Sequence, residues 1–97
     1  MNKVSYEERT VVYNTALLIY GKSNQLVVAL EELSEVQKEI CKAMRGDTDL
    51  EHLAEEIADA TIMLEQVRLL YGVNDLVCKK MDEKIKRLVD RMMGGSS

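Results

Sequence analysis

The chain has no proline, no tryptophan and no phenylalanine, and only five of its 97 residues are glycine. The glycines are therefore the main helix breakers, and they leave four long stretches of sequence uninterrupted. Runs of β-branched residues with period two, which would indicate strands, are absent. The sequence predicts an all-α fold, and its length suits one domain.

Further absences narrow the class of protein. No run of about 18 apolar residues is present, which argues against a transmembrane helix, and "MNKVSYEERT" lacks the apolar core of a signal peptide. No CxxC pair occurs, so Cys41 and Cys78 indicate neither a zinc site nor a disulfide framework and suit a reducing cytoplasm. With 13 basic and 17 acidic residues, the chain lacks the basic excess that binds nucleic acids or anionic membranes. We therefore expect a cytoplasmic protein with no nucleic-acid or membrane partner.

The breakers and the capping residues divide the chain into four predicted helices. Their expected ranges are about 6–20, 24–45, 49–71 and 75–93. The expected N-terminal caps are Ser5 with Glu8, Ser23 or Asn24, Thr48 with Glu51, and Asn74. We expect residues 1–93 to form a single domain, followed by a flexible tail, "GGSS", at 94–97.

The third predicted helix carries apolar residues on most of its sides. Ile62, Met63, Leu69 and Leu70 all point away from its main apolar stripe. A helix that is apolar all round is buried all round, and four helices from a 97-residue chain cannot surround it. The sequence therefore predicts an obligate dimer, with this helix near the interface.

Two stretches place pairs of carboxylates among apolar residues. Glu32 and Glu35 in "LEELSEVQKE" share one helical face, and Glu56 and Asp59 repeat this spacing in "AEEIADATIML". If the intervening turn centres near residue 47, Glu35 and Asp59 are each 12 residues from it. The two pairs then lie within about one turn of the same level. Four converging carboxylates repel one another unless a cation holds them.

The donor set decides which cation such a site would take. Oxygen ligands select Mg²⁺, Mn²⁺ or Ca²⁺. A di-iron bundle needs a Glu-x-x-His on each of two helices, which His52, the only histidine, does not complete. Zinc lacks its histidine and cysteine ligands. Because Mg²⁺ held by carboxylates keeps positions open for phosphates, the spacing favours a Mg²⁺-dependent phosphate enzyme. The alternative is two solvated helix faces, on which Glu-x-x-Glu is common.

The sequence "EELSE" at 31–35, followed by "EIAD" at 56–59, resembles the Glu-Glu-x-x-Glu … Glu-x-x-Asp motif of MazG-like nucleotide pyrophosphohydrolases. These enzymes belong to the all-α NTP pyrophosphatase superfamily, and the resemblance covers most of the chain. It implies a four-helix MazG-like bundle, dimeric or tetrameric, that hydrolyses an NTP or dNTP to the monophosphate and pyrophosphate. It also implies a Mg²⁺ cofactor, for which Mn²⁺ can substitute, and a bacterial protein or a phage protein in the bacterial cytoplasm. The metal ligands that it implies are Glu32, Glu35, Glu56 and Asp59.

Further roles are expected around these ligands. Glu35 is our choice for the carboxylate that orients or deprotonates the attacking water. Gln25 precedes Glu32 on the same helical face, where its amide would read a base edge or hold a water; otherwise it is an ordinary first-turn glutamine. The last helix has a basic face, on which the resemblance favours Lys84 and Arg87 as the phosphate contacts; the alternative is a solvated helix end.

The chain also departs from its larger relatives. The dCTP-specific enzymes that it resembles use tryptophans in the base pocket, and this chain has none. Their base preference therefore does not carry over. The competing hypothesis is a non-catalytic helical dimerisation or interaction module with a vestigial or structural metal site.

Overall fold

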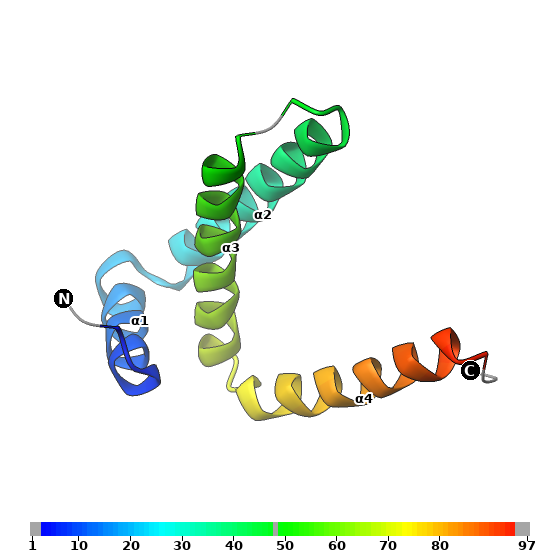
Figure 1. The fold of residues 1–97 in the computed structure, drawn as a ribbon. Helices are drawn as coiled ribbons and strands as arrows, with labels where there is room; N and C mark the ends of the chain where they lie inside the picture. The colour runs from blue at the N-terminus through cyan, green and yellow to red at the C-terminus, as the bar shows by residue number, and fades with distance from the viewer. Residues whose placement is uncertain (1–2, 48, 95–97) are drawn as a thin grey trace.

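The chain folds into four consecutive α-helices (Figure 1): α1 (Tyr6–Tyr20), α2 (Lys22–Met44), α3 (Leu50–Leu70) and α4 (Asn74–Met92). The structure is a computed structural model, and it describes residues 3–47 and 49–94. No strand occurs in these ranges, so the all-α prediction and the number of helices are confirmed. None of the described helices has the length and apolarity needed to cross a membrane. Most of the predicted tail, 95–97, lies outside the described residues.

The helix boundaries agree with the predicted ones to within two residues, but the caps agree less well. The capping box of α1 is confirmed: the Ser5 hydroxyl accepts from the Glu8 N–H at 3.1 Å, and the Glu8 carboxylate accepts from the Ser5 N–H at 3.2 Å. The predicted cap of α2 at Ser23 or Asn24 is wrong. Gly21, with a φ of 87°, is the only residue between α1 and α2. It therefore occupies the N-cap position of α2, and no polar side chain caps this helix.

The starts of α3 and α4 also differ from expectation. Asp49 caps α3, and its carboxylate accepts from the N–H of Glu51 at 2.9 Å. The predicted capping residue, Thr48, lies outside the described residues. Asn74 does not cap α4: it is the first residue of the helix, and its amide donates to the Tyr6 hydroxyl at 3.2 Å.

The centre of the fold is the antiparallel pair formed by α2 and α3, against which α1 packs (Figure 1). Ala29 on α2 and Ala60 on α3 are both buried, and small residues at such positions let two helices approach closely. Met63 and Tyr13 complete the set of apolar residues that are buried in the described chain. This core is small for 97 residues.

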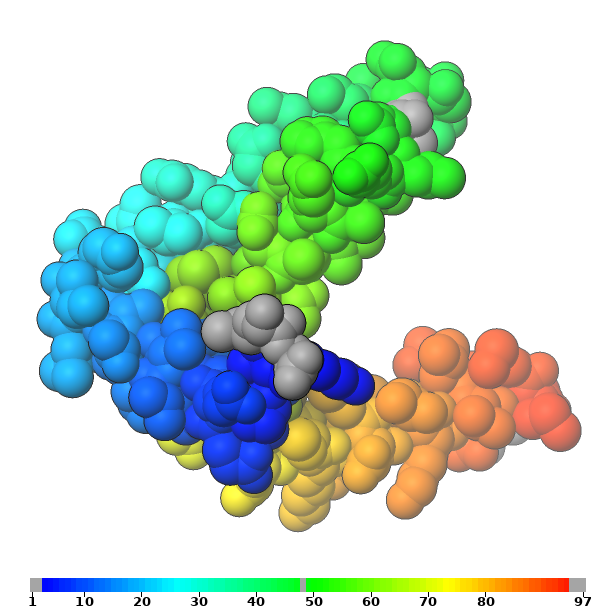
Figure 2. Space-filling view, turned by 60° about the vertical axis from the view of Figure 1, so that its left-hand side comes forward, coloured from blue at the N-terminus to red at the C-terminus, as the bar shows by residue number. Residues whose placement is uncertain are grey.

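The last helix, α4, has no buried residue; apart from the hydrogen bond of Asn74 to Tyr6 on α1, it packs only against α3 among the described helices. Figure 2 shows it extending away from the rest of the molecule, with open space between it and the α2–α3 pair. The radius of gyration is 16.4 Å, whereas a compact domain of this length has roughly 12.5 Å. A single chain therefore does not close into a four-helix bundle.

A polar contact joins α1 to α3. The Tyr13 hydroxyl donates to the Glu65 carboxylate, which also lies 3.3 Å from the Arg9 Nε. Burial, and then the hydrogen bond to Glu65 and its charge, raise the pKa of Tyr13 from 10.0 to about 12. Because this pKa is raised on folding, the neutral hydroxyl stabilises the fold fully below pH 10, and that contribution is lost as the pH rises through about 12.

We expect Tyr13→Phe to lower the free energy of unfolding by about 1 kcal/mol at pH 8, because it removes one part-buried hydrogen bond. The difference from the wild type should shrink at pH 11, where the wild type has begun to lose this contribution. Urea denaturation at both pH values and one protein concentration measures it. Tyr20→Phe is the control, because Tyr20 is exposed. If the loss in free energy of unfolding were the same at both pH values, the raised pKa of Tyr13 would not be a property of its hydrogen bond to Glu65.

Candidate metal centre

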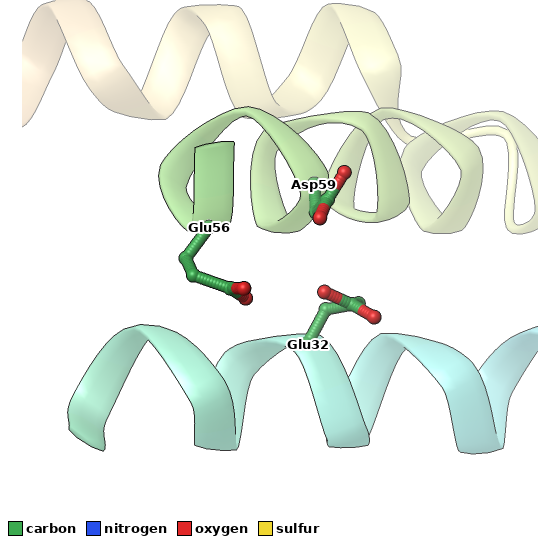
Figure 3. A group of neighbouring side chains, drawn as sticks. All are labelled: Glu32, Glu56 and Asp59. Carbon is green, nitrogen blue, oxygen red and sulfur yellow. The ribbon is translucent and has the colours of Figure 1, made fainter. Parts of the chain in front are cut away.

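Three carboxylates converge between α2 and α3, and we call Glu32, Glu56 and Asp59 the acidic triad. One oxygen from each lies within 4.8 Å of the others. Figure 3 shows Glu32 reaching from α2 toward Glu56 and Asp59 on α3. The two α3 residues are three positions apart, so they share the helical face that meets α2. The predicted convergence of carboxylates across the hairpin therefore holds for three of the four residues.

The acidic triad is partly shielded from water. Glu32 is half-buried and only 14% of the Glu56 side chain is exposed, whereas Asp59 is exposed. Burial raises the pKa of Glu32, and the charges of Asp59, Glu56, Glu35 and Glu31 raise it further, in that order. A cation placed among these oxygens would relieve this repulsion.

The donor set fits Mg²⁺ or Mn²⁺. Oxygen ligands about 2.1 Å from Mg²⁺ are roughly 3–4 Å apart, so oxygens within 4.8 Å of one another need only a small closure. Val28, Ile62 and Met63 join Glu32 and Asp59 around a cavity of about 240 Å³. Its apolar walls strengthen electrostatic interactions inside it, and the exposed Asp59 leaves one side open to solvent.

Glu35 lies outside this group. It is half-exposed, and its nearest cation is Lys38 on the same helix, 3.8 Å away. The structure places Glu32, not Glu35, opposite Asp59, so the helices are shifted by about one turn from the predicted register. In this register Glu35 is level with Glu56, one turn from Glu32. Its roles as ligand and as base stay predictions.

The turn explains the shift in register. The Asp47 N–H bonds back to the Lys42 carbonyl at 2.9 Å, and Asp49 is extended. Asp47 therefore already lies beside the last turn of α2, before α3 begins. An extended residue advances about twice as far as a helical one, so counting residues from the middle of the turn misplaces α3.

The residues expected to bind substrate lie apart from the triad. Gln25 is buried, and its Nε2 donates to the Gln66 Oε1 at 2.8 Å. Lys84 and Arg87 are exposed on α4, in the part that extends away from the α2–α3 pair (Figure 1). One chain does not bring them to the carboxylates, and the three substrate-binding roles stay predictions.

Sequence reasoning missed a buried ionic contact near the triad. Glu39 is only 2% exposed, with the Lys42 Nζ at 3.3 Å and the His52 Nε2 at 3.6 Å. His52 has 46% of its side chain exposed and also lies 3.8 Å from the Glu56 carboxylate. The signal that could have revealed Glu39 is its spacing of seven residues from Glu32.

Comparison of the chain with protein-family models, with curated proteins and with solved structures finds no match. The resemblance to MazG-like enzymes therefore depends on the two acidic motifs and their spacing.

Proposed function

We propose that this chain is a Mg²⁺-dependent nucleoside triphosphate pyrophosphohydrolase, which releases pyrophosphate and a nucleoside monophosphate. The observation that carries the proposal is the acidic triad: three carboxylates from two helices have oxygens within 4.8 Å of one another. They occupy three positions of the motif that resembles the MazG-like one. The proposal includes the expected location, the cytoplasm of a bacterium or of a phage-infected bacterium.

In this mechanism the acidic triad and Glu35 have different roles in the hydrolysis. The triad would hold Mg²⁺, which would supply positive charge to the phosphate oxygens of the substrate and acidify a water. Glu35, outside the triad and one turn from Glu32, orients that water and takes its proton. The water oxygen forms a bond to phosphorus as the bond to the pyrophosphate leaving group breaks.

The proposal also includes a homodimer, or a tetramer made of two such dimers. The exposed surface of one chain is 7577 Å², against roughly 5,600 Å² for a monomer of this mass. An apolar groove of about 490 Å³ lies between α3 and α4. The residues lining this α3–α4 groove are Thr61, Leu64, Glu65, Val67, Arg68, Val73, Val77 and Met81. We assign it to a helix of a second copy, which would cover the exposed apolar face of α4.

The dimer also gives Lys84 and Arg87 a place in the mechanism. Because α4 extends away from the α2–α3 pair of its own chain (Figure 2), its basic face would serve the triad of the partner chain. There the two cations would contact the phosphate oxygens of the substrate.

The test is pyrophosphate release from a panel of NTPs and dNTPs with Mg²⁺, with Mn²⁺ and with EDTA. We expect release from at least one nucleotide, with kcat on the order of 1 s⁻¹ or more and loss of activity in EDTA. If folded protein that binds Mn²⁺ released no pyrophosphate from any nucleotide of the panel, the non-catalytic interaction module would be favoured. The exposed apolar surface is the observation that supports that second candidate.

A further inference from the structure

Polar contacts cross between α2 and α3 at regular intervals. On α2 the residues concerned are spaced by seven, and their partners on α3 have the same spacing in the opposite direction. The pairs, which we call the polar seam, are Gln25–Gln66, Glu32–Asp59 and Glu39–His52. Seven residues are two helical turns, the repeat of a coiled coil. The central pair belongs to the acidic triad, and we call the other two the outer pairs.

The outer pairs contain the most deeply buried polar groups of the described chain. Gln25 and Gln66 are 9% and 6% exposed, and Glu39 is 2% exposed. Buried amides and carboxylates are costly unless they have polar partners. Across the α2–α3 contact, these groups find their partners only in the observed register.

If α3 slid by one turn so that residue 63, instead of residue 66, lay opposite Gln25, both outer pairs would be broken. Gln25 would then face Met63, which cannot accept or donate a strong hydrogen bond. Glu39 would face Asp49, so two carboxylates would meet at a buried position.

A slip of one turn in the other direction is equally unfavourable. Gln25 would face Leu69, and Glu39 would face Glu55. This second slip produces the register that symmetric counting from the turn predicts, with Glu35 opposite Asp59. The outer pairs therefore discriminate against both neighbouring registers.

We propose that the outer pairs are positioning pairs: they lock α2 and α3 in the register that brings the acidic triad together. A one-turn slip keeps the helices and much of their apolar contact but separates Glu32 from Asp59. A single buried polar residue fixes the register of a coiled coil in the same way. The inference rests on the proposed function only in taking the triad as the metal ligands.

The test replaces the first outer pair by leucines in the double variant Gln25→Leu/Gln66→Leu. Leucine preserves burial at both positions and removes the directional hydrogen bond, about 10 Å from Glu32 along α2. We expect Mn²⁺ affinity, measured by titration without nucleotide, to fall by about tenfold or more, with no loss of helicity or of melting temperature. Because nucleotide is absent, a role of Gln25 in substrate binding does not affect this readout.

A second readout follows the register without metal. Val28 and Met63 line the same cavity, so their methyl groups should give a nuclear Overhauser effect in the wild type. In the double variant this signal should weaken, because a slip moves Val28 opposite residue 60 or 66. Gln66→Glu keeps the oxygen that accepts from Gln25 and should retain both the signal and the Mn²⁺ affinity.

The outcomes separate the two proposals. A leucine double variant that keeps both the Val28–Met63 signal and wild-type Mn²⁺ affinity overturns the inference. A wild type that binds no Mn²⁺, with the signal lost in the double variant, supports the positioning role and contradicts the proposed function. If the double variant fails to fold, His52→Leu against His52→Gln makes the same comparison at the other end of the polar seam.

Discussion

Glu32→Gln should raise the melting temperature of the metal-free protein and abolish its metal-dependent activity. The pKa of Glu32 is raised by burial and by its acidic neighbours, so the folded state holds its proton more tightly than the unfolded chain does. Ionisation of Glu32 therefore costs stability as the pH rises through the carboxyl range. Neutral glutamine avoids this cost at pH 7.5, and we expect a gain of about 2–5 °C in EDTA.

With Mg²⁺ the order of stability should reverse. The wild type gains about 2.7 kcal/mol when the free metal is at 100 times its dissociation constant, whereas the variant has lost one ligand. Pyrophosphate release should fall on the order of 10³-fold, about 4 kcal/mol of transition-state stabilisation. Thermal unfolding in EDTA and in Mg²⁺, at pH 5 and 7.5, together with the activity assay, measures both effects. The stability gain should shrink as the pH is lowered, because the folded state holds the Glu32 proton more tightly than the unfolded chain does.

Glu55→Gln is the matched control, because it removes the same charge from an exposed side chain next to Glu56. It should leave both melting temperatures and the activity close to the wild type. A Glu32→Gln protein with full activity would contradict the assignment of Glu32 as a metal ligand.

The number and the limits of the helices could be predicted from the sequence because they depend on local features. Glycines end the helices wherever the chain needs a positive φ, as at Gly21, and Ser5 with Glu8 forms a capping box within one turn. The cap of α2 was mispredicted because Gly21 ends one helix and starts the next with no residue in between. A polar residue nearby in the sequence is no cap unless it stands at the N-cap position.

The candidate site could be predicted only in part, because it depends on how two helices are aligned. The spacing of Glu56 and Asp59 fixes their common face, so the meeting of carboxylates from α2 and α3 was foreseeable. Their alignment depends on the turn that follows α2, where the Asp47 N–H bonds back to the Lys42 carbonyl. The buried Glu39 was also missed, since its neighbours in "EVQKEI" are typical of a solvated face and its partner His52 is distant in sequence.

Met81→Glu should convert the protein to monomers and remove its activity, yet leave metal binding intact. Met81 lines the apolar α3–α4 groove, which we assign to a second copy of the chain. Burying a carboxylate in this groove costs desolvation free energy that an ion pair with Arg68, which also lines it, need not repay. We expect the dissociation constant of the dimer to rise by about 100-fold or more, equivalent to about 2.7 kcal/mol. Sedimentation velocity over a range of concentrations measures it, with Mn²⁺ titration and pyrophosphate release on the same samples.

The combination of results distinguishes the dimer from a merely damaged fold. The acidic triad lies within one chain, so Mn²⁺ should still bind to the monomer. The proposed phosphate contacts, Lys84 and Arg87, would come from the partner, so nucleotide hydrolysis should fail. Met44→Glu makes the same chemical change at a residue that is 82% exposed at the end of α2, and it should alter neither assembly nor activity. A Met81→Glu protein that hydrolyses nucleotides as a monomer would contradict the shared site, and a dimer unchanged by the substitution would place the interface elsewhere.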